Sequence, residues 1–129
     1  MLFAIGSSRA VLQEEFPMLD FSGCEVEWRY EAHTHGVTRR AERVRRRLFE
    51  ATAQNIVVVT HRGFIAHLVE WDIFENCEIG SYEFVDAEEA ERVRMGVDPD
   101  RRPTDYGPTV LRRTGGCKID RTSLNKENK

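Results

Sequence analysis

The stretch QNIVVVTHRGFIAHLVEW, residues 54 to 71, decides the fold expected for this chain. Residues 56–59 are all apolar, which is typical of a central parallel strand that is covered on both faces. After Gly63, apolar side chains recur at helical spacing, at Phe64, Ile65, Leu68 and Trp71. The sequence therefore predicts a buried strand, a turn and a helix in direct succession.

His61 stands where this expected strand ends. An α/β sheet binds its ligands at the carboxyl ends of its strands, and the first N–H groups of the next helix favour an anion there. A histidine at that place could hold a phosphoryl group, with Gly63 allowing a close turn of the backbone. Spacing alone leaves open the alternative that His61 only begins a helix and carries no chemistry.

The patterns on either side favour an α/β protein. Residues 38–52 repeat apolar side chains at helical spacing with Thr38 as the N-cap, so a helix, a buried strand and a second helix follow one another. The other expected elements are a helix at 7–16, an alternating, strand-like segment at 24–32, a strand at 78–85, a helix at 86–95 with Asp86 and Glu89 in capping-box positions, and a short strand at 107–113.

Length, charge and cysteine content narrow the classes of function. A chain of 129 residues suits one domain, and a net charge of −3 draws it neither to nucleic acid nor to an anionic membrane. The start MLFAIGSSRAVL lacks the basic region and long apolar run of a signal peptide, and no stretch is apolar enough to span a membrane. Three cysteines without a C-x-x-C pair favour reduced thiols and a cytoplasmic protein.

Four stretches together resemble the histidine phosphatase superfamily, the phosphoglycerate mutase-like proteins. IVVVTHRGFIAHLVEW is similar to the family's second-histidine motif, and GSSRAVLQEEFPMLDFSGCEVEW to the stretch before its long helix. TRRAERVRRRLFE resembles that helix, and FENCEIGSYEF a later strand. The resemblance implies the C-terminal portion of a three-layer fold, a truncated phosphoglycerate mutase-like domain over residues 1–114 with a short, mostly parallel sheet between helices. A disordered polar tail is expected over residues 115–129.

The family resemblance also implies a reaction and a site. It implies phosphoryl transfer or phosphomonoester hydrolysis through a phosphohistidine, without cofactor or metal, on a phosphorylated small molecule. His61 matches the second histidine, which holds phosphoryl oxygens, and is the catalytic candidate. The substrate-binding candidates are Arg62, Gly63 and Asn76. Arg62 stands where the family has a glycine.

The nucleophile of that reaction is missing from this sequence. No Arg-His-Gly motif is present, and no residue matches the family's acid. Because losing a nucleophile usually costs many powers of ten in rate, we expect a catalytically incomplete protein, a pseudoenzyme. Two alternatives stay open: a non-catalytic remnant that binds a phosphate ligand or a protein, and an incomplete chain whose missing part restores the site.

Three further features need an interpretation. Thr34-His35-Gly36 could be a degenerate nucleophile motif, and His33 with His35 could bind a metal, although a zinc site needs three or four ligands. Solvated loop histidines are the plainer reading. The arginines between residues 39 and 47 could bind a polyanion, but an apolar stripe between them favours a solvated helix face.

A strand as apolar as residues 56–59 needs neighbours on both sides. Without the family's nucleophile-bearing strand beside it, we expect a free sheet edge or a bare apolar groove. Such an edge is prone to self-association.

Overall fold

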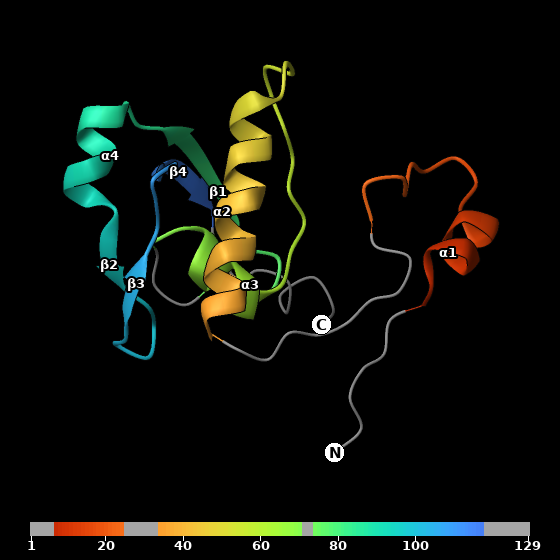
Figure 1. Ribbon diagram of the computed structural model, residues 1–129, viewed down its shortest axis with the longest axis horizontal. Helices are drawn as coiled ribbons and strands as arrows, with labels where there is room; N and C mark the ends of the chain where they lie inside the picture. Colours follow the sequence, from red (N-terminus) through yellow and green to blue (C-terminus); the bar gives the residue numbers. More distant parts are fainter. Residues whose placement is uncertain (1–6, 25–33, 71–73, 118–129) are drawn as a thin grey trace, which may run out of the picture. The chain divides into compact units, whose positions relative to one another are not determined.

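The computed structural model describes residues 7–24, 34–70 and 74–117 (Figure 1). They belong to two compact units, Met1–His33 and Thr34–Lys129, which are treated separately below.

In the described part of the first unit, residues 7–24, the chain forms one short helix, α1, at Arg9–Glu15. Ser8 is its N-cap, and the serine hydroxyl accepts a hydrogen bond from the Val11 N–H. The helix ends at Glu15 with Phe16 as its C-cap, so it lies within the range 7–16 that the sequence predicts. The alternating segment expected at 24–32 lies, after Cys24, outside the described residues.

The longest element of the second unit is helix α2, Thr34–Glu50. It begins before the helix expected at residues 38–52, so Thr38 lies inside the helix and is not its N-cap. Its buried side is the apolar stripe read from the sequence, with Ala41 fully buried and Val44 packed against the core.

Two shorter helices follow. Helix α3, Arg62–Leu68, is the helix expected after His61, and its last residue is buried. Helix α4, Ala87–Val93, begins as predicted, because the Asp86 carboxylate accepts a hydrogen bond of 2.9 Å from the Glu89 N–H.

The strands among the residues that the structure describes form two separate sheets. Strands β1, Ile79–Phe84, and β4, Leu111–Cys117, make one sheet, and β2, Met95–Val97, and β3, Pro103–Asp105, make the other. Both sheets are antiparallel. The mixed α/β class is confirmed, whereas the expected mostly parallel sheet is wrong.

Strand β4 extends three residues into the stretch where the polar tail was expected. Gly116 allows this, since it has a φ of +142° and a Cβ atom there would collide with the Ile79 carbonyl. The pairing runs from Ile79 opposite Cys117 to Phe84 opposite Leu111. The rest of the expected tail, 118–129, lies outside the described residues.

Residues 56–59 are the main departure from the expected fold. They are extended but belong to neither sheet. Their exposed fractions are 44% for Ile56, 89% for Val57, 44% for Val58 and 93% for Val59, so the expected burial on both faces is wrong. A central strand is buried only where neighbouring strands and covering layers exist, and the described residues supply no such neighbours to this segment.

The apolar core lies between α2, α3 and the β1–β4 sheet. Its buried members are Ala41, Leu68, Val69 and Phe74, and the partly buried side chains packed against them are Val44, Phe64, Ile65, Tyr82 and Leu111. The core therefore fixes α3, and with it the start of that helix at His61, against α2.

The β2–β3 hairpin is attached to α3 by Tyr106. This side chain is almost fully buried, and its hydroxyl donates to the Ala66 carbonyl at 3.0 Å. Burial raises the pKa of Tyr106 to about 12. Next to it, Arg94 forms a two-pronged ion pair with Asp105, with nitrogen–oxygen distances of 3.0 and 2.8 Å.

Candidate functional site

His61 occupies the N-cap position of α3 with an extended backbone, and its side chain makes no capping hydrogen bond. The His61 carbonyl accepts hydrogen bonds of 3.0 Å from the N–H groups of Phe64 and Ile65. The imidazole is exposed. No hydrogen bond or ion pair joins it to another of the residues described here, so His61 lies alone at the start of its helix.

The substrate-binding candidates make no hydrogen bond or ion pair with the His61 side chain among the described residues. Arg62 is exposed on the first turn of α3, and a Cβ at Gly63 would meet nothing within 4 Å, so packing does not require a glycine there. Asn76 lies exposed in the turn closed by the Glu78 N–H and the Glu75 carbonyl. Across residues 34–70 and 74–117, no hydrogen bond or ion pair links Asn76 to His61 or Arg62.

A hollow formed by the described residues lies elsewhere. It is lined by strand β1, the start of α4 and strand β4, and none of the predicted site residues contributes to it: the lining residues are Glu83, Phe84, Val85, Asp86, Glu89, Arg112 and Thr114. Glu89 and Arg112 pair across it. The site predicted around His61 therefore does not coincide with this concave surface.

Arg45 fixes the position of α3, and the sequence wrongly predicted that this arginine would be exposed to solvent. Its side chain is fully buried, although the arginine run of α2 was expected to be a solvated face. The guanidinium donates to the carbonyls of His67 and Leu68 at 3.0 and 2.9 Å, which are free because α3 ends there. A cation at that place also suits the negative end of the helix dipole.

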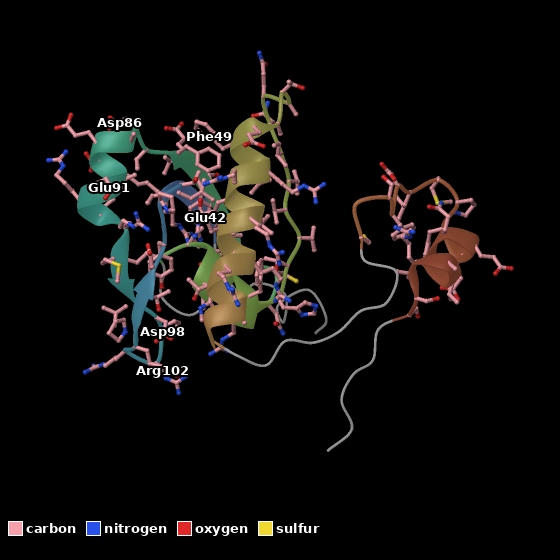
Figure 2. The ribbon with its side chains drawn as sticks, in the orientation of Figure 1. Glu42, Phe49, Asp86, Glu91, Asp98 and Arg102 are labelled. Carbon is pink, nitrogen blue, oxygen red and sulfur yellow. The ribbon has the colours of Figure 1, made fainter. Side chains whose placement is uncertain are left out.

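Glu42 holds the other side of the Arg45 guanidinium. The Arg45 Nε donates to a Glu42 oxygen at 3.1 Å, and the Thr109 hydroxyl donates to the second Glu42 oxygen at 2.8 Å. Burial lowers the pKa of Arg45, and the Glu42 carboxylate opposes that shift. Figure 2 shows Glu42 on the side of α2 that is turned toward β1 and β4. One ion pair thus joins α2, the end of α3 and the loop before β4.

His67 is half-buried on α3. Its Nδ1 atom is buried without a hydrogen-bond partner among the residues described. Burial lowers the pKa of His67, while Asp98 opposes this shift and Arg40 adds to it. Burial therefore favours the neutral form of the ring.

The remaining histidine candidates lie largely outside the described residues. His33 is not described, and neither is the side chain of His35, so the metal pair and the rival nucleophile motif stay predictions. In the described ranges, no three histidine, cysteine or acidic side chains gather as a metal site would require. Cys24, Cys77 and Cys117 are free thiols.

The 56–59 segment presents an unpaired backbone to its surroundings. The Ala51 N–H completes α2, and the next backbone group that forms a hydrogen bond is the His61 carbonyl. The backbone groups between these two form no hydrogen bond with any residue that the structure describes. Every second side chain is more than 85% exposed, and all four are β-branched. The sequence does carry the signal for this feature, a continuous apolar run, but the run was read as a buried strand.

Compared with known proteins, the chain matches no family model, no curated protein and no solved structure at a significant level. Of the helices in residues 7–24, 34–70 and 74–117, none has the length and apolar content that crossing a lipid bilayer demands.

Proposed function

We propose that this chain is a phosphoglycerate mutase-like protein that does not catalyse phosphoryl transfer and instead binds another polypeptide through the 56–59 segment. The observation that carries the proposal is the extended, exposed and unpaired state of these four β-branched residues. A row of free N–H and C=O groups is a template onto which a second chain can add a strand.

The chemistry of the chain supports the non-catalytic part of the proposal. The sequence has no Arg-His-Gly motif to supply an attacking histidine. His61 is exposed and has no acidic or basic partner within the described part of the chain. A lone imidazole without nucleophile, acid or cation cluster supplies little of the charge neutralisation that phosphoryl transfer needs.

Phosphate binding without catalysis is less well supported than protein binding. Two of the first amides of α3, those of Phe64 and Ile65, donate to the His61 carbonyl and are not free for an anion. The helix is also short, and its dipole is correspondingly weak. The three free cysteines support a reducing compartment, such as the cytoplasm, as the place where the protein works.

Strand addition is tested by titrating the isotope-labelled chain with a short neutral peptide in which valine alternates with glutamine. We expect the amide signals of residues 56–59 to shift and their hydrogen exchange to slow, because new backbone hydrogen bonds form there. Val57→Pro and Val58→Pro remove N–H groups from opposite edges of the segment, so one variant should lose binding and the other keep it.

Val57→Thr is the matched control, since it keeps both the N–H group and the β-branched shape. Its binding should equal that of the parent chain. Shifts confined to other residues, or unchanged binding by both proline variants, would contradict strand addition.

The catalytic reading has its own test, hydrolysis of a generic aryl phosphate by the chain and by His61→Ala. We expect no turnover above the uncatalysed rate in either protein, because the nucleophile is missing. Turnover that the substitution abolishes would show instead that the chain is an active phosphatase.

A further inference from the structure

We propose that the strand added to the 56–59 segment is an acidic one, a polypeptide stretch in which carboxylate side chains alternate with apolar side chains. This inference names the partner class for the proposed function and rests on it. The arginines of α2, the path of the chain between α2 and α3, and the alternating exposure of the segment support an acidic partner.

Three arginines of α2 form a stripe along one side of the helix. Arg40, Arg43 and Arg47 are spaced three and four residues apart, which places them on one helix face. Arg40 lies over the Phe64 ring, with its guanidinium carbon 4.7 Å from the ring centre. This contact places the Arg40 end of the stripe at the start of α3.

The charges of this stripe are not neutralised within the described residues. Arg43 and Arg47 are exposed, and neither forms an ion pair with any carboxylate described here. The nearby Glu42 carboxylate pairs with Arg45 at 3.1 Å, and its second ion-pair distance, to Arg46, is 4.0 Å. The stripe is therefore a free cationic surface.

The 56–59 segment lies on the path of the chain from the end of α2 to the Arg40–Phe64 contact. The chain leaves α2 at Glu50 and must reach Phe64, which lies on Arg40, ten residues back along the helix. It therefore returns in the direction opposite to α2, and Figure 1 shows residues 51–61 as an extended strip, drawn on the other side of α2 from the two sheets.

The exposure pattern then defines what the partner strand must carry. Ile56 and Val58 are each 44% exposed, whereas Val57 and Val59 are 89% and 93% exposed, so the alternation of a strand places Ile56 and Val58 on the less exposed side of the segment. In a paired strand, side chains directly opposite share a face. The partner's residues beside Val57 and Val59 are therefore apolar, and its alternate residues point toward α2, where the arginine stripe selects carboxylates.

A second copy of this chain suits the surface less well than an acidic strand. Pairing the segment with its own copy would bring the arginine stripes of both copies together, and like charges across an interface cost binding energy. Acidic residues of this unit do gather on α4, where Figure 2 shows Asp86 and Glu91, but a helix cannot add a strand. A nucleic acid backbone offers phosphate acceptors but no N–H donors for the free carbonyls and no apolar contact for the valines.

The experiment compares three short fluorescent peptides in which valine alternates with glutamate, glutamine or lysine. We expect the glutamate peptide to bind about tenfold more tightly than the glutamine peptide, since several exposed ion pairs each contribute modestly, and the lysine peptide to bind least. Added salt should remove the advantage of the glutamate peptide.

Arg43→Gln/Arg47→Gln should remove the preference for glutamate and leave glutamine-peptide binding unchanged. Arg101→Gln/Arg102→Gln is the matched control, because it changes the net charge equally at exposed residues in the β2–β3 turn. Figure 2 shows Arg102 at the end of this hairpin, away from the 51–61 strip. The control variant should keep the glutamate preference.

Each other result overturns a stated part of the argument. Equal affinity for the glutamate and glutamine peptides refutes the acidic partner but leaves strand addition standing, whereas no binding by any peptide refutes both. Sedimentation that shows self-association of the parent chain, lost in Val57→Pro, identifies a second copy as the occupant instead. An oligonucleotide that displaces the glutamate peptide and shifts only α2 amides identifies a nucleic acid surface instead.

Discussion

At the scale of single residues, Arg45 joins more parts of the second unit than any apolar contact described above. Its guanidinium lies between the free carbonyls at the end of α3 and the Glu42 carboxylate, which in turn accepts hydrogen bonds from Thr109. Removing one partner of such a buried pair leaves the other charge and the carbonyls without compensation.

We therefore expect Arg45→Ala to lower the free energy of unfolding by about 3 kcal/mol, a typical value for breaking a buried ion pair. Arg46→Ala is the matched control: its side chain is 62% exposed and approaches the same Glu42 only to 4.0 Å. Its loss should stay within about 0.5 kcal/mol. Urea denaturation with unchanged m-values gives both numbers.

Equal losses in the two variants would show that the Arg45 cluster contributes no more than a surface pair. Arg45→Met keeps most of the side-chain volume and removes the charge. A variant as stable as the parent chain would assign the role of Arg45 to packing of its aliphatic stem.

The roles of residues that depend on near neighbours in the sequence were predictable, whereas the burial of Arg45 was not. The Asp86 cap follows from a capping box read over four consecutive residues. The burial of Arg45 depends on carbonyls of His67 and Leu68, more than twenty residues away, which helical periodicity within α2 does not report. In the sequence, Arg45 is indistinguishable from the exposed arginines on either side.

At the scale of secondary-structure elements, the β2–β3 hairpin depends on Tyr106 for its attachment to α3. The phenol hydroxyl donates to the Ala66 carbonyl, and the ring is 2% exposed. Burial disfavours the charged phenolate, so the pKa of Tyr106 is raised from its ordinary value of 10.0 to about 12.

A raised pKa in the folded state implies a defined pH dependence. The stabilisation from neutral Tyr106 is complete below pH 10, and it falls as the pH rises from 10 toward 12, because the unfolded chain ionises its tyrosine first. We expect Tyr106→Phe to lack the ultraviolet absorbance step of a tyrosine ionising near pH 12. At neutral pH it should cost about 1 kcal/mol, the value of one hydrogen bond.

Tyr82→Phe serves as the comparison, since burial also raises the pKa of Tyr82 but no hydrogen bond ties that residue to α3. If Tyr106→Phe retained the absorbance step near pH 12, the step would belong to another tyrosine and the attachment of the hairpin would need a different explanation.

Elements whose signal is local were predicted from the sequence. Helices α1 and α4 and strand β1 lie within two residues of their expected limits, because capping residues and periodicity mark them. Helix α3 begins where it was expected but ends at Leu68, three residues before Trp71. The β2–β3 hairpin was missed, since its strands have three residues each and no apolar alternation. The buried strand at 56–59 was expected wrongly, because an apolar run reports strand propensity but not whether neighbouring strands exist.

At the scale of the whole second unit, charge is distributed unequally between its helices. The first turn of α4 carries Glu88 and Glu89, while α2 has no acid in its first turn and exposes arginines along its length. A net charge of −3 hides this separation. The candidate site could therefore be located from the sequence only as a set of separate features, an arginine run and an apolar run, whose proximity depends on the tertiary fold.

The bare 56–59 segment has a second consequence, for the behaviour of the protein at high concentration. Residues 55–60 contain no charge, proline or glycine and are mostly β-branched, a composition that favours the stacked, tightly interdigitated sheets of amyloid. Arg62 follows closely and acts as a charged gatekeeper. A partner that covers this segment therefore also protects the chain from fibril growth, and fibrils would begin at these residues when that partner is scarce.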